Sequence, residues 1–366
     1  MSSLRKLISA IVPATLRHRL LRWRQLAKLK ANYRYDIDRF IEHGCPFREF
    51  DAGGELRAYI RMLSHGLEKG MSFRDVRKGF GLEKARELMR ALRRYLERFE
   101  CHDELATAVA CLEQYVAFHR TRGDANPALE AELEQLRSRL PRIPNASPPA
   151  GGVLQVTRDE IWQQARRDLT GFFASRYSIR QFSPEPVALD LIARAVRMAQ
   201  KTPSVCNRQS ARVYVYDNDD TGAGVLACQN GNRGFGHLAD KVLIVTADLQ
   251  HFLSIGERNQ CWIDGGMFAM SLIYALHSLG LGTCCLNWSV EQDADERLRR
   301  AAGIAASENV IMLLAVGHLP EELGVARSER KDLNEVLRDR TAALPPEPPQ
   351  TASEPPVAEA TALRSV

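Results

Sequence analysis

Apolar residues recur at helical spacing through the first 140 residues, and almost no strand-like alternation interrupts them. The first stripe returns every four residues and consists of Leu4, Ile8, Val12, Leu16 and Leu20. This spacing places the apolar side chains on one face of a helix. By the same criterion we predict helices over 84–99, 104–119 and 127–140. The pattern therefore predicts an all-helical N-terminal domain over residues 1–140, although it assigns no role to that domain.

The second half of the chain mixes helical and strand-like patterns. A short amphipathic helix is predicted over 188–201, and a long apolar one over 262–279, which Gly280 ends as a C-cap would. Runs of β-branched and aromatic residues predict strands over 213–216, 241–246, 283–286 and 310–317. Helices and strands around one long apolar helix indicate an α+β domain over 153–340.

A proline- and glycine-rich stretch over 141–152 separates the two halves. It contains four prolines and two glycines, which cannot continue a helix, so we interpret it as a linker. The last segment, 341–366, is rich in Pro, Ala, Glu and Ser, and we expect it to be a disordered tail.

Composition narrows the class of protein. The chain has 366 residues, of which 45% are hydrophobic and 26% charged, as expected for a globular protein with a sizeable core. It has no run of 18 uncharged apolar residues, so we expect no transmembrane span. The eight cysteines are scattered without a CxxC pair, which favours a reduced, cytoplasmic protein with neither a zinc site nor a disulfide framework. We interpret Cys206, Cys284 and Cys285 as packed thiols. The alternatives are a redox-active Cys206 and a vicinal disulfide between the other two.

Basic residues gather near the N-terminus, where ten Lys and Arg stand against Asp36 and Asp38 between residues 1 and 41. An amphipathic basic helix can lie on an anionic membrane surface, but a helix that packs on protein shows the same stripe. We favour packing on protein and keep a weak membrane-surface contact through residues 1–40 as the alternative. Neither aromatic platforms nor a known reader motif indicates a nucleic-acid partner.

Three polar side chains alternate in the segment 175–182. Arg176, Ser178 and Arg180 are two residues apart, so in an extended conformation they share one side. Two guanidiniums and a hydroxyl on one side suit a phosphate group, because Arg donates in a bidentate fork.

A second motif follows about 23 residues later, after a predicted helix. It contains Pro203, Ser204, Asn207 and Gln209. Together the two motifs resemble R-x-S-x-R-x-F and P-S-x-x-N-x-Q of the flavin-dependent nitroreductase family. The resemblance extends from 174 to 336 and includes Asn232, the glycine-flanked long helix that ends at 279–283, and a basic motif at Arg330.

The resemblance implies a nitroreductase-like FMN-binding fold, with a central mixed or antiparallel sheet flanked by helices. It also implies FMN as the cofactor and a homodimer with the FMN at its interface. Implied phosphate and ribityl ligands are Arg176, Ser178, Arg180 and Arg330, with Lys331 as the alternate in the last motif. Implied contacts from the partner subunit are Pro203, Ser204 and Asn207. Asn232 would contact the pyrimidine edge of the ring, and the backbone around Leu286 and Asn287 would face N5.

The implied activity is that of an FMN-dependent oxidoreductase, which passes hydride from NAD(P)H through flavin N5 to a small nitro-, quinone- or enone-like acceptor. Because the flavin performs the redox chemistry, no catalytic side chain is expected. The alternative is a partner-dependent tailoring or flavin-binding protein without free NAD(P)H turnover.

Two features of this chain depart from the family. After Gln209 the family often continues with Pro-Trp, whereas this chain has Ser210-Ala211. The chain has Asn287-Trp288 where the family often shows two small residues near N5, so Trp288 would stack over the substrate face or narrow the pocket. The segment 63–81 contains several glycines. We interpret it as a segment that serves ordinary domain packing, and the alternative is that it docks near the flavin domain.

Overall fold

The computed structural model describes residues 14–47, 50, 52–100, 103–139, 151–165 and 167–341. Contacts group residues 1–325 into one compact unit and residues 326–366 into another. The predicted helix positions Leu4, Ile8 and Val12 lie outside the described residues, as do most of the predicted linker (141–150) and the tail from 342 onward. The predicted domain boundary at 141–152 therefore stays a prediction.

Helices form the first part of the chain. Their bounds are α2 (Ala14–His43), α3 (Gly53–Met71), α4 (Leu82–Arg98), α5 (Asp103–Thr121) and α6 (Pro127–Ser138). The predictions over 84–99, 104–119 and 127–140 are confirmed to within two residues. The apolar faces of α3 to α6 share one core, which includes Leu56, Leu67, Leu88, Leu92 and Leu112. The sequence pattern did not predict α3, because glycines interrupt it. Gly70 leaves room for the Phe80 ring, which a Cβ would meet at 2.0 Å.

Helix α2 contacts the rest of its unit through polar groups and through Phe40, which packs against the core around Phe252. Leu16 and Leu20 are 48% and 51% exposed, so the prediction that their stripe packs on protein is wrong for these two residues within this chain. Lys28 pairs with Glu291 at 2.9 Å, and the Tyr35 hydroxyl donates to Asp295 at 2.8 Å. Arg39 donates to the backbone oxygen of Glu308 at 2.7 Å and is only 9% exposed. Within the described part of the chain, no helix is both long and apolar enough to cross a membrane.

The second part of the first unit contains a four-stranded sheet in the order β1-β2-β4-β3, in which every neighbouring pair is antiparallel. The strands are β1 (Ala211–Asp217), β2 (Lys241–Asp248), β3 (Leu281–Asn287) and β4 (Glu308–His318). One isolated parallel bridge joins Ser178 to Thr283 at the outer edge of β3. The predicted α+β class and central sheet are thus confirmed.

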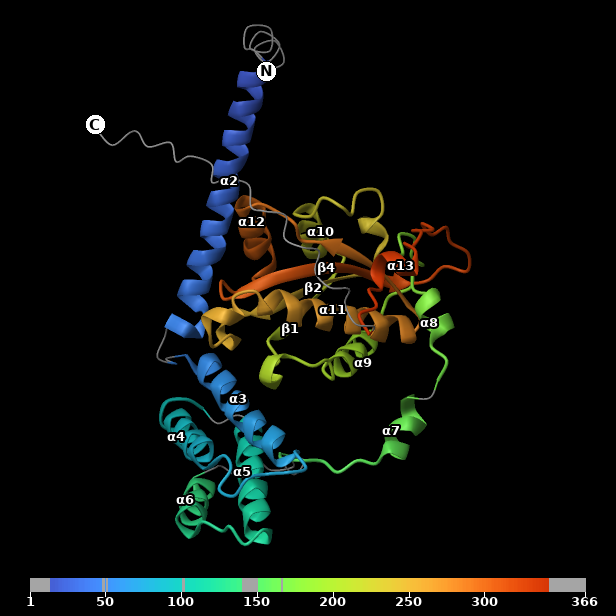
Figure 1. Cartoon of the computed structure of the whole chain (residues 1–366). Helices are drawn as coiled ribbons and strands as arrows, with labels where there is room; N and C mark the ends of the chain where they lie inside the picture. The colour runs from blue at the N-terminus through green and yellow to red at the C-terminus, as the bar shows by residue number, and fades with distance from the viewer. Residues whose placement is uncertain are drawn as a thin grey trace, which may run out of the picture. The chain divides into compact units, whose positions relative to one another are not determined.

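Helices cover both faces of this sheet (Figure 1). Helices α9 (Leu189–Ala199) and α11 (Gln260–Ser278) pack with Leu243 and Val245 on one face. Helices α10 (Asp220–Ala227) and α12 (Gln292–Ala302) pack with Val242 and Ile244 on the other. The side chains of β2 alternate between two cores, and this is why the whole strand is buried.

Several short elements complete the first unit. They are η1 (Cys45–Phe47), α7 (Arg158–Ala165), α8 (Thr170–Ala174), η2 (Val205–Asn207), η3 (Gly236–Leu238), η4 (Leu249–His251) and η5 (Ile255–Glu257). In the second unit, α13 (Leu333–Val336) begins at Asp332, whose carboxylate accepts from the backbone N–H of Asn334 at 2.8 Å.

Candidate functional site

The predicted site residues fall into three groups. Arg176, Ser178, Arg180, Asn232 and Asn287 lie around β3. The residues Pro203, Ser204 and Asn207 belong to the segment 203–209, here called the 203–209 loop, which leads into β1. Strands β1 and β3 are the two outer strands of the sheet. Arg330 belongs to the second unit, where it donates to the backbone oxygen of Ser328.

The alternation of the first motif is explained by its pairing with β3. The Ile179 N–H donates to the Thr283 carbonyl oxygen at 2.8 Å, next to the bridge between Ser178 and Thr283. This extended backbone sends the Ile179 side chain into the core, where it is 6% exposed. Arg180 consequently remains exposed on the other side.

Both arginines of the first motif lie close to the cysteines of β3. Burial raises the pKa of the Cys284 thiol, and the Arg180 guanidinium opposes this rise. Desolvation likewise raises the pKa of the Cys285 thiol against the effect of Arg176. Arg180 also lies 5.8 Å from the centre of the Phe235 ring. Both cysteines are free thiols in the structure; Cys284 is packed as predicted, whereas Cys285 is exposed, so the prediction of a packed thiol is wrong for Cys285.

An amide network connects the other two residues of this group. Gln229, which is 5% exposed, donates to the Asn287 carbonyl oxygen at 3.1 Å. The Asn232 side-chain nitrogen donates to the backbone oxygens of Leu226 (2.8 Å) and Gln229 (2.7 Å). Because these bonds engage its NH₂ group, Asn232 would meet a ligand through its Oδ1 acceptor. Sequence reasoning missed Gln229, which no motif distinguishes from a surface glutamine.

The 203–209 loop has an unusual backbone. Cys206, Asn207 and Gln209 have φ values of 48°, 52° and 53°, a region that costs a non-glycine residue on the order of 1 kcal/mol. Two bonds support the loop locally: the Val205 N–H donates to Asp264 at 3.1 Å, and the Gln209 N–H donates to the Ser204 hydroxyl at 3.0 Å.

Arg208 fixes the middle of this loop from inside the protein. Its side chain is 1% exposed and donates to both carboxylate oxygens of Glu257, at 3.0 and 2.6 Å. Its carbonyl oxygen accepts from Arg61 Nη1 on α3 and from His251 Nδ1, each at 2.7 Å. Sequence reasoning missed Arg208 and all three partners. Arg208 occupies a variable position of the motif, and its partners are distant in sequence.

His251 is neutral in this arrangement. Burial, together with the neighbouring cations Arg212 and Arg61, lowers its pKa to about 3. A carbonyl oxygen can only accept, so Nδ1 carries the proton that is donated to Arg208. Nε2 is then the acceptor for Arg212 Nη2, which lies 3.4 Å away.

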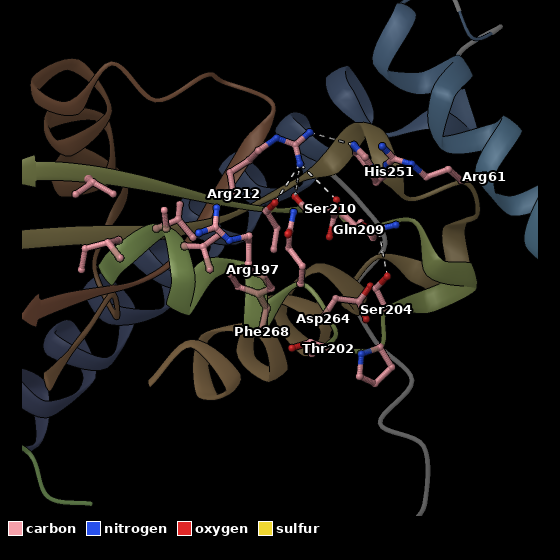
Figure 2. Close-up of a pocket in the computed structure, with 18 of the residues that line it drawn as sticks. Arg61, Arg197, Thr202, Ser204, Gln209, Ser210, Arg212, His251, Asp264 and Phe268 are labelled. Carbon is pink, nitrogen blue, oxygen red and sulfur yellow. Dashed lines mark hydrogen bonds between the residues drawn. The ribbon is translucent and has the colours of Figure 1, made fainter. Parts of the chain in front are cut away.

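A cavity of about 800 Å³ lies beside the loop and is lined by residues of α3, α9, α11 and β1. Figure 2 shows the side chains that line it. Its polar end contains Ser204, Gln209, Arg212 and His251, and Arg61 lies next to His251. Its other end is apolar and is formed by Leu189, Ile192, Val196, Val213 and Val215. A smaller cavity of about 200 Å³ lies between the helices α3 and α5 and the loop residues Asn207 and Gln209.

Known proteins resemble the second half of the chain. Residues 173–227 and 229–318 match the model of the nitroreductase family. No protein of curated function matches the chain.

Solved structures with a similar fold cover a little under half of the chain. An FMN-dependent nitroreductase from Clostridium difficile is 22% identical, covers 46% of this chain and 98% of its own, and has a TM-score of 0.39. A nitroreductase-like family protein from Bacillus cereus is 14% identical, covers 49% and 98%, and has a TM-score of 0.41. A variant of an FMN- and NADPH-dependent nitroreductase from Sphigopyxis sp. strain HMH is 22% identical, covers 48% and 99%, and has a TM-score of 0.39.

Proposed function

We propose, from the premise that residues 173–318 form a domain of the nitroreductase family, that this chain is an FMN-dependent oxidoreductase. In this proposal, NAD(P)H is the electron donor, and a small nitro-, quinone- or enone-like molecule is the acceptor. The observation that carries the proposal is the gathering of two arginines, a serine and two asparagines around β3, since these residues come from three separate segments of the chain.

The donors on the outer side of β3 fit a phosphate monoester. Arg176 and Arg180 supply guanidiniums and Ser178 supplies a hydroxyl, and Ser178 and Arg180 flank the buried Ile179. A guanidinium near a phosphate offsets its charge and donates two parallel hydrogen bonds. Arg330 would add a third cation from the second unit, and its role stays a prediction.

The amide groups fit the polar edge of a flat ring. Gln229 accepts from the Asn232 side chain and donates to the Asn287 backbone oxygen, and so links Asn232 to the end of β3. When bound, FMN supplies the centre that accepts and returns hydride, and the residues of this chain need only hold it and exclude water. Trp288 is anchored by a 2.8 Å bond from Nε1 to Asp295, which holds its ring next to the end of β3.

A complete site would require two copies of the chain. The two groups of predicted ligands flank opposite outer strands of one sheet, so the 203–209 loop would serve the β3 group of a partner subunit. We therefore include a homodimer in the proposal, together with a cytoplasmic location.

The visible spectrum of the purified protein tests the cofactor, and anaerobic mixing with NADH and NADPH tests the donor. We expect bound flavin absorbance that bleaches with at least one nicotinamide. A colourless protein that does not bind added FMN would refute the cofactor. Flavin that binds but never bleaches would instead support the partner-dependent tailoring or flavin-binding alternative.

A further inference from the structure

We propose that Arg61 of α3 is a positioning residue for the 203–209 loop, so that the helical N-terminal part shapes the cofactor site. The expected effect on FMN binding rests on the proposed function, whereas the hydrogen bond from Arg61 to the loop does not. Arg61 and Arg208 are 147 residues apart in sequence, and Arg61 Nη1 donates to the Arg208 carbonyl oxygen at 2.7 Å.

The bond is made at the most constrained point of the loop. Arg208 stands between Asn207 and Gln209, which both have left-handed φ values. Its side chain is fixed by Glu257, and its carbonyl oxygen accepts from two donors, Arg61 and His251. Both ends of this residue are therefore held, and the peptide that follows Arg208 cannot rotate without breaking a hydrogen bond.

The two donors to this carbonyl are not equivalent. His251 belongs to η4, which follows β2 directly, so it is part of the sheet scaffold. Arg61 comes from the helical part and is the one of the two that carries a charge, because His251 is neutral. A hydrogen bond from a charged donor contributes more than one from a neutral donor.

The contact of α3 with the loop extends beyond this bond. The small cavity beside the loop is lined by Arg61, Ser64, His65 and Glu68 of α3 on one side and by Asn207 and Gln209 on the other. Asn207 is exposed and is one of the predicted flavin contacts. A shift of α3 would therefore change the surroundings of Asn207 as well as the support of Arg208.

The test compares Arg61→Met and Arg61→Lys with Arg57→Met in the full chain. Arg57 lies one turn earlier on α3 and lines the same large cavity, but its Nη1 donates to Tyr95 within the helical part. Two readouts are needed: the Kd of the apoprotein for FMN, and hydrogen exchange of the backbone amides in 205–209 of the apoprotein.

We expect Arg61→Met to weaken FMN binding about tenfold, the size of one lost charged hydrogen bond, and to speed exchange at Gln209. Arg61→Lys keeps a charged donor, so it should restore part of the FMN affinity and part of the slow exchange. Arg57→Met should leave the FMN affinity and the exchange unchanged. If Arg61→Met has the same Kd for FMN and the same exchange rates as the wild type, the inference is overturned. If the wild-type protein binds no FMN, the proposed function fails, while the exchange comparison still decides the role of Arg61.

Discussion

At the scale of single residues, Arg208 shows how a buried charge can determine the shape of an exposed loop. It is the largest of the fully buried side chains in the described structure, and Glu257 neutralises it. Since the loop contains three left-handed residues, its conformation depends on partners outside it.

Glu257→Gln tests this dependence. The substitution keeps the shape of the side chain but leaves the Arg208 charge unpaired, which we expect to lower the free energy of unfolding by about 3 kcal/mol. Urea unfolding measures the loss. The matched control is Glu296→Gln, which breaks an exposed pair with Arg300 (3.7 Å) and should cost at most about 0.5 kcal/mol. Equal losses in the two variants would contradict a structural role for the buried pair.

His251 should make stability depend on pH. Its folded pKa of about 3 lies below its ordinary value of 6.5, so the unfolded state binds more protons between these values. The contribution of the neutral imidazole to the free energy of unfolding is fully present above about pH 6.5. It is lost as the pH falls, and the loss reaches about 2 kcal/mol at about pH 5. His251→Asn keeps a donor for the Arg208 carbonyl but removes the titration. Urea unfolding at about pH 7.5 and about pH 5 should show a smaller loss in this variant than in the wild type.

Arg180 should contribute strongly to the affinity for FMN. Replacing it by Gln removes a cation from the predicted phosphate ligands, which corresponds to about a tenfold or greater rise in the Kd. Arg194, an exposed arginine of α9, is the matched control, and Arg194→Gln should bind FMN like the wild type. Fluorescence titration of the apoprotein gives both constants. If both variants bind equally, Arg180 is not a phosphate ligand.

The sequence predicted part of this site for a clear reason. The spacing of Arg176, Ser178 and Arg180 follows the two-residue period of an extended strand, but the structure shows that period only from Ser178 to Arg180, because Tyr177 is 41% exposed where a regular strand would bury it with Ile179. The support of the 203–209 loop could not be predicted in this way, because Arg61, His251 and Glu257 are joined to Arg208 only by the tertiary fold. The flavin contacts themselves stay predictions.

At the scale of elements, Gly280 ends the longest helix of the sheet layer and turns the chain into β3. Its φ is 79°, and a Cβ at this position would meet no atom within 4 Å, so only backbone strain opposes a side chain. Gly224 offers a contrast, because it lies inside α10, also has open space around it and has no positive φ.

The two glycines should respond to alanine in opposite directions. Gly280→Ala should lower the free energy of unfolding by about 1 kcal/mol, because a left-handed conformation strains alanine. Gly224→Ala should raise it by about 0.5 to 1 kcal/mol, because alanine favours a helix interior. Chemical denaturation of both variants checks the signs. A loss of stability in Gly224→Ala would contradict the prediction for α10.

Elements with a regular apolar stripe were predicted well, and the others were missed. Helices α4, α5, α6, α9 and α11 and all four strands carry such a stripe or run. Helix α12 buries one face with Asp295, Leu298 and Ala302, of which only Leu298 is a large apolar residue, and α10 contains two glycines, so neither has an apolar run that stands out in the sequence. Both are stabilised by packing on the sheet and on each other, a tertiary contribution that local propensity does not contain.

At the scale of the whole molecule, the separation of the predicted ligands is the main argument for a dimer. In this four-stranded sheet, β1 and β3 lie at opposite edges, so β2 and β4 separate the β3 group from the 203–209 loop of the same copy. Helix α11 offers a surface for a second copy: Trp262, Ile263 and Met267 are 46%, 53% and 39% exposed. Exposed apolar residues that gather on one face of a helix are typical of a protein interface.

Ile263→Glu should separate the subunits and weaken FMN binding together. The charge would be buried at the interface without a partner, which costs several kcal/mol and shifts a dimer towards monomers. The control, Leu154→Glu, places the same charge on a side chain that is 82% exposed and outside the sheet layer, so it should leave assembly unchanged. Sedimentation velocity gives the mass, and titration of the same samples gives the FMN affinity.

A wild-type monomer that binds FMN would show that one chain completes the site. An Ile263→Glu dimer with normal affinity would mean that another surface joins the subunits. Monomers without affinity would instead tie the cofactor to the interface.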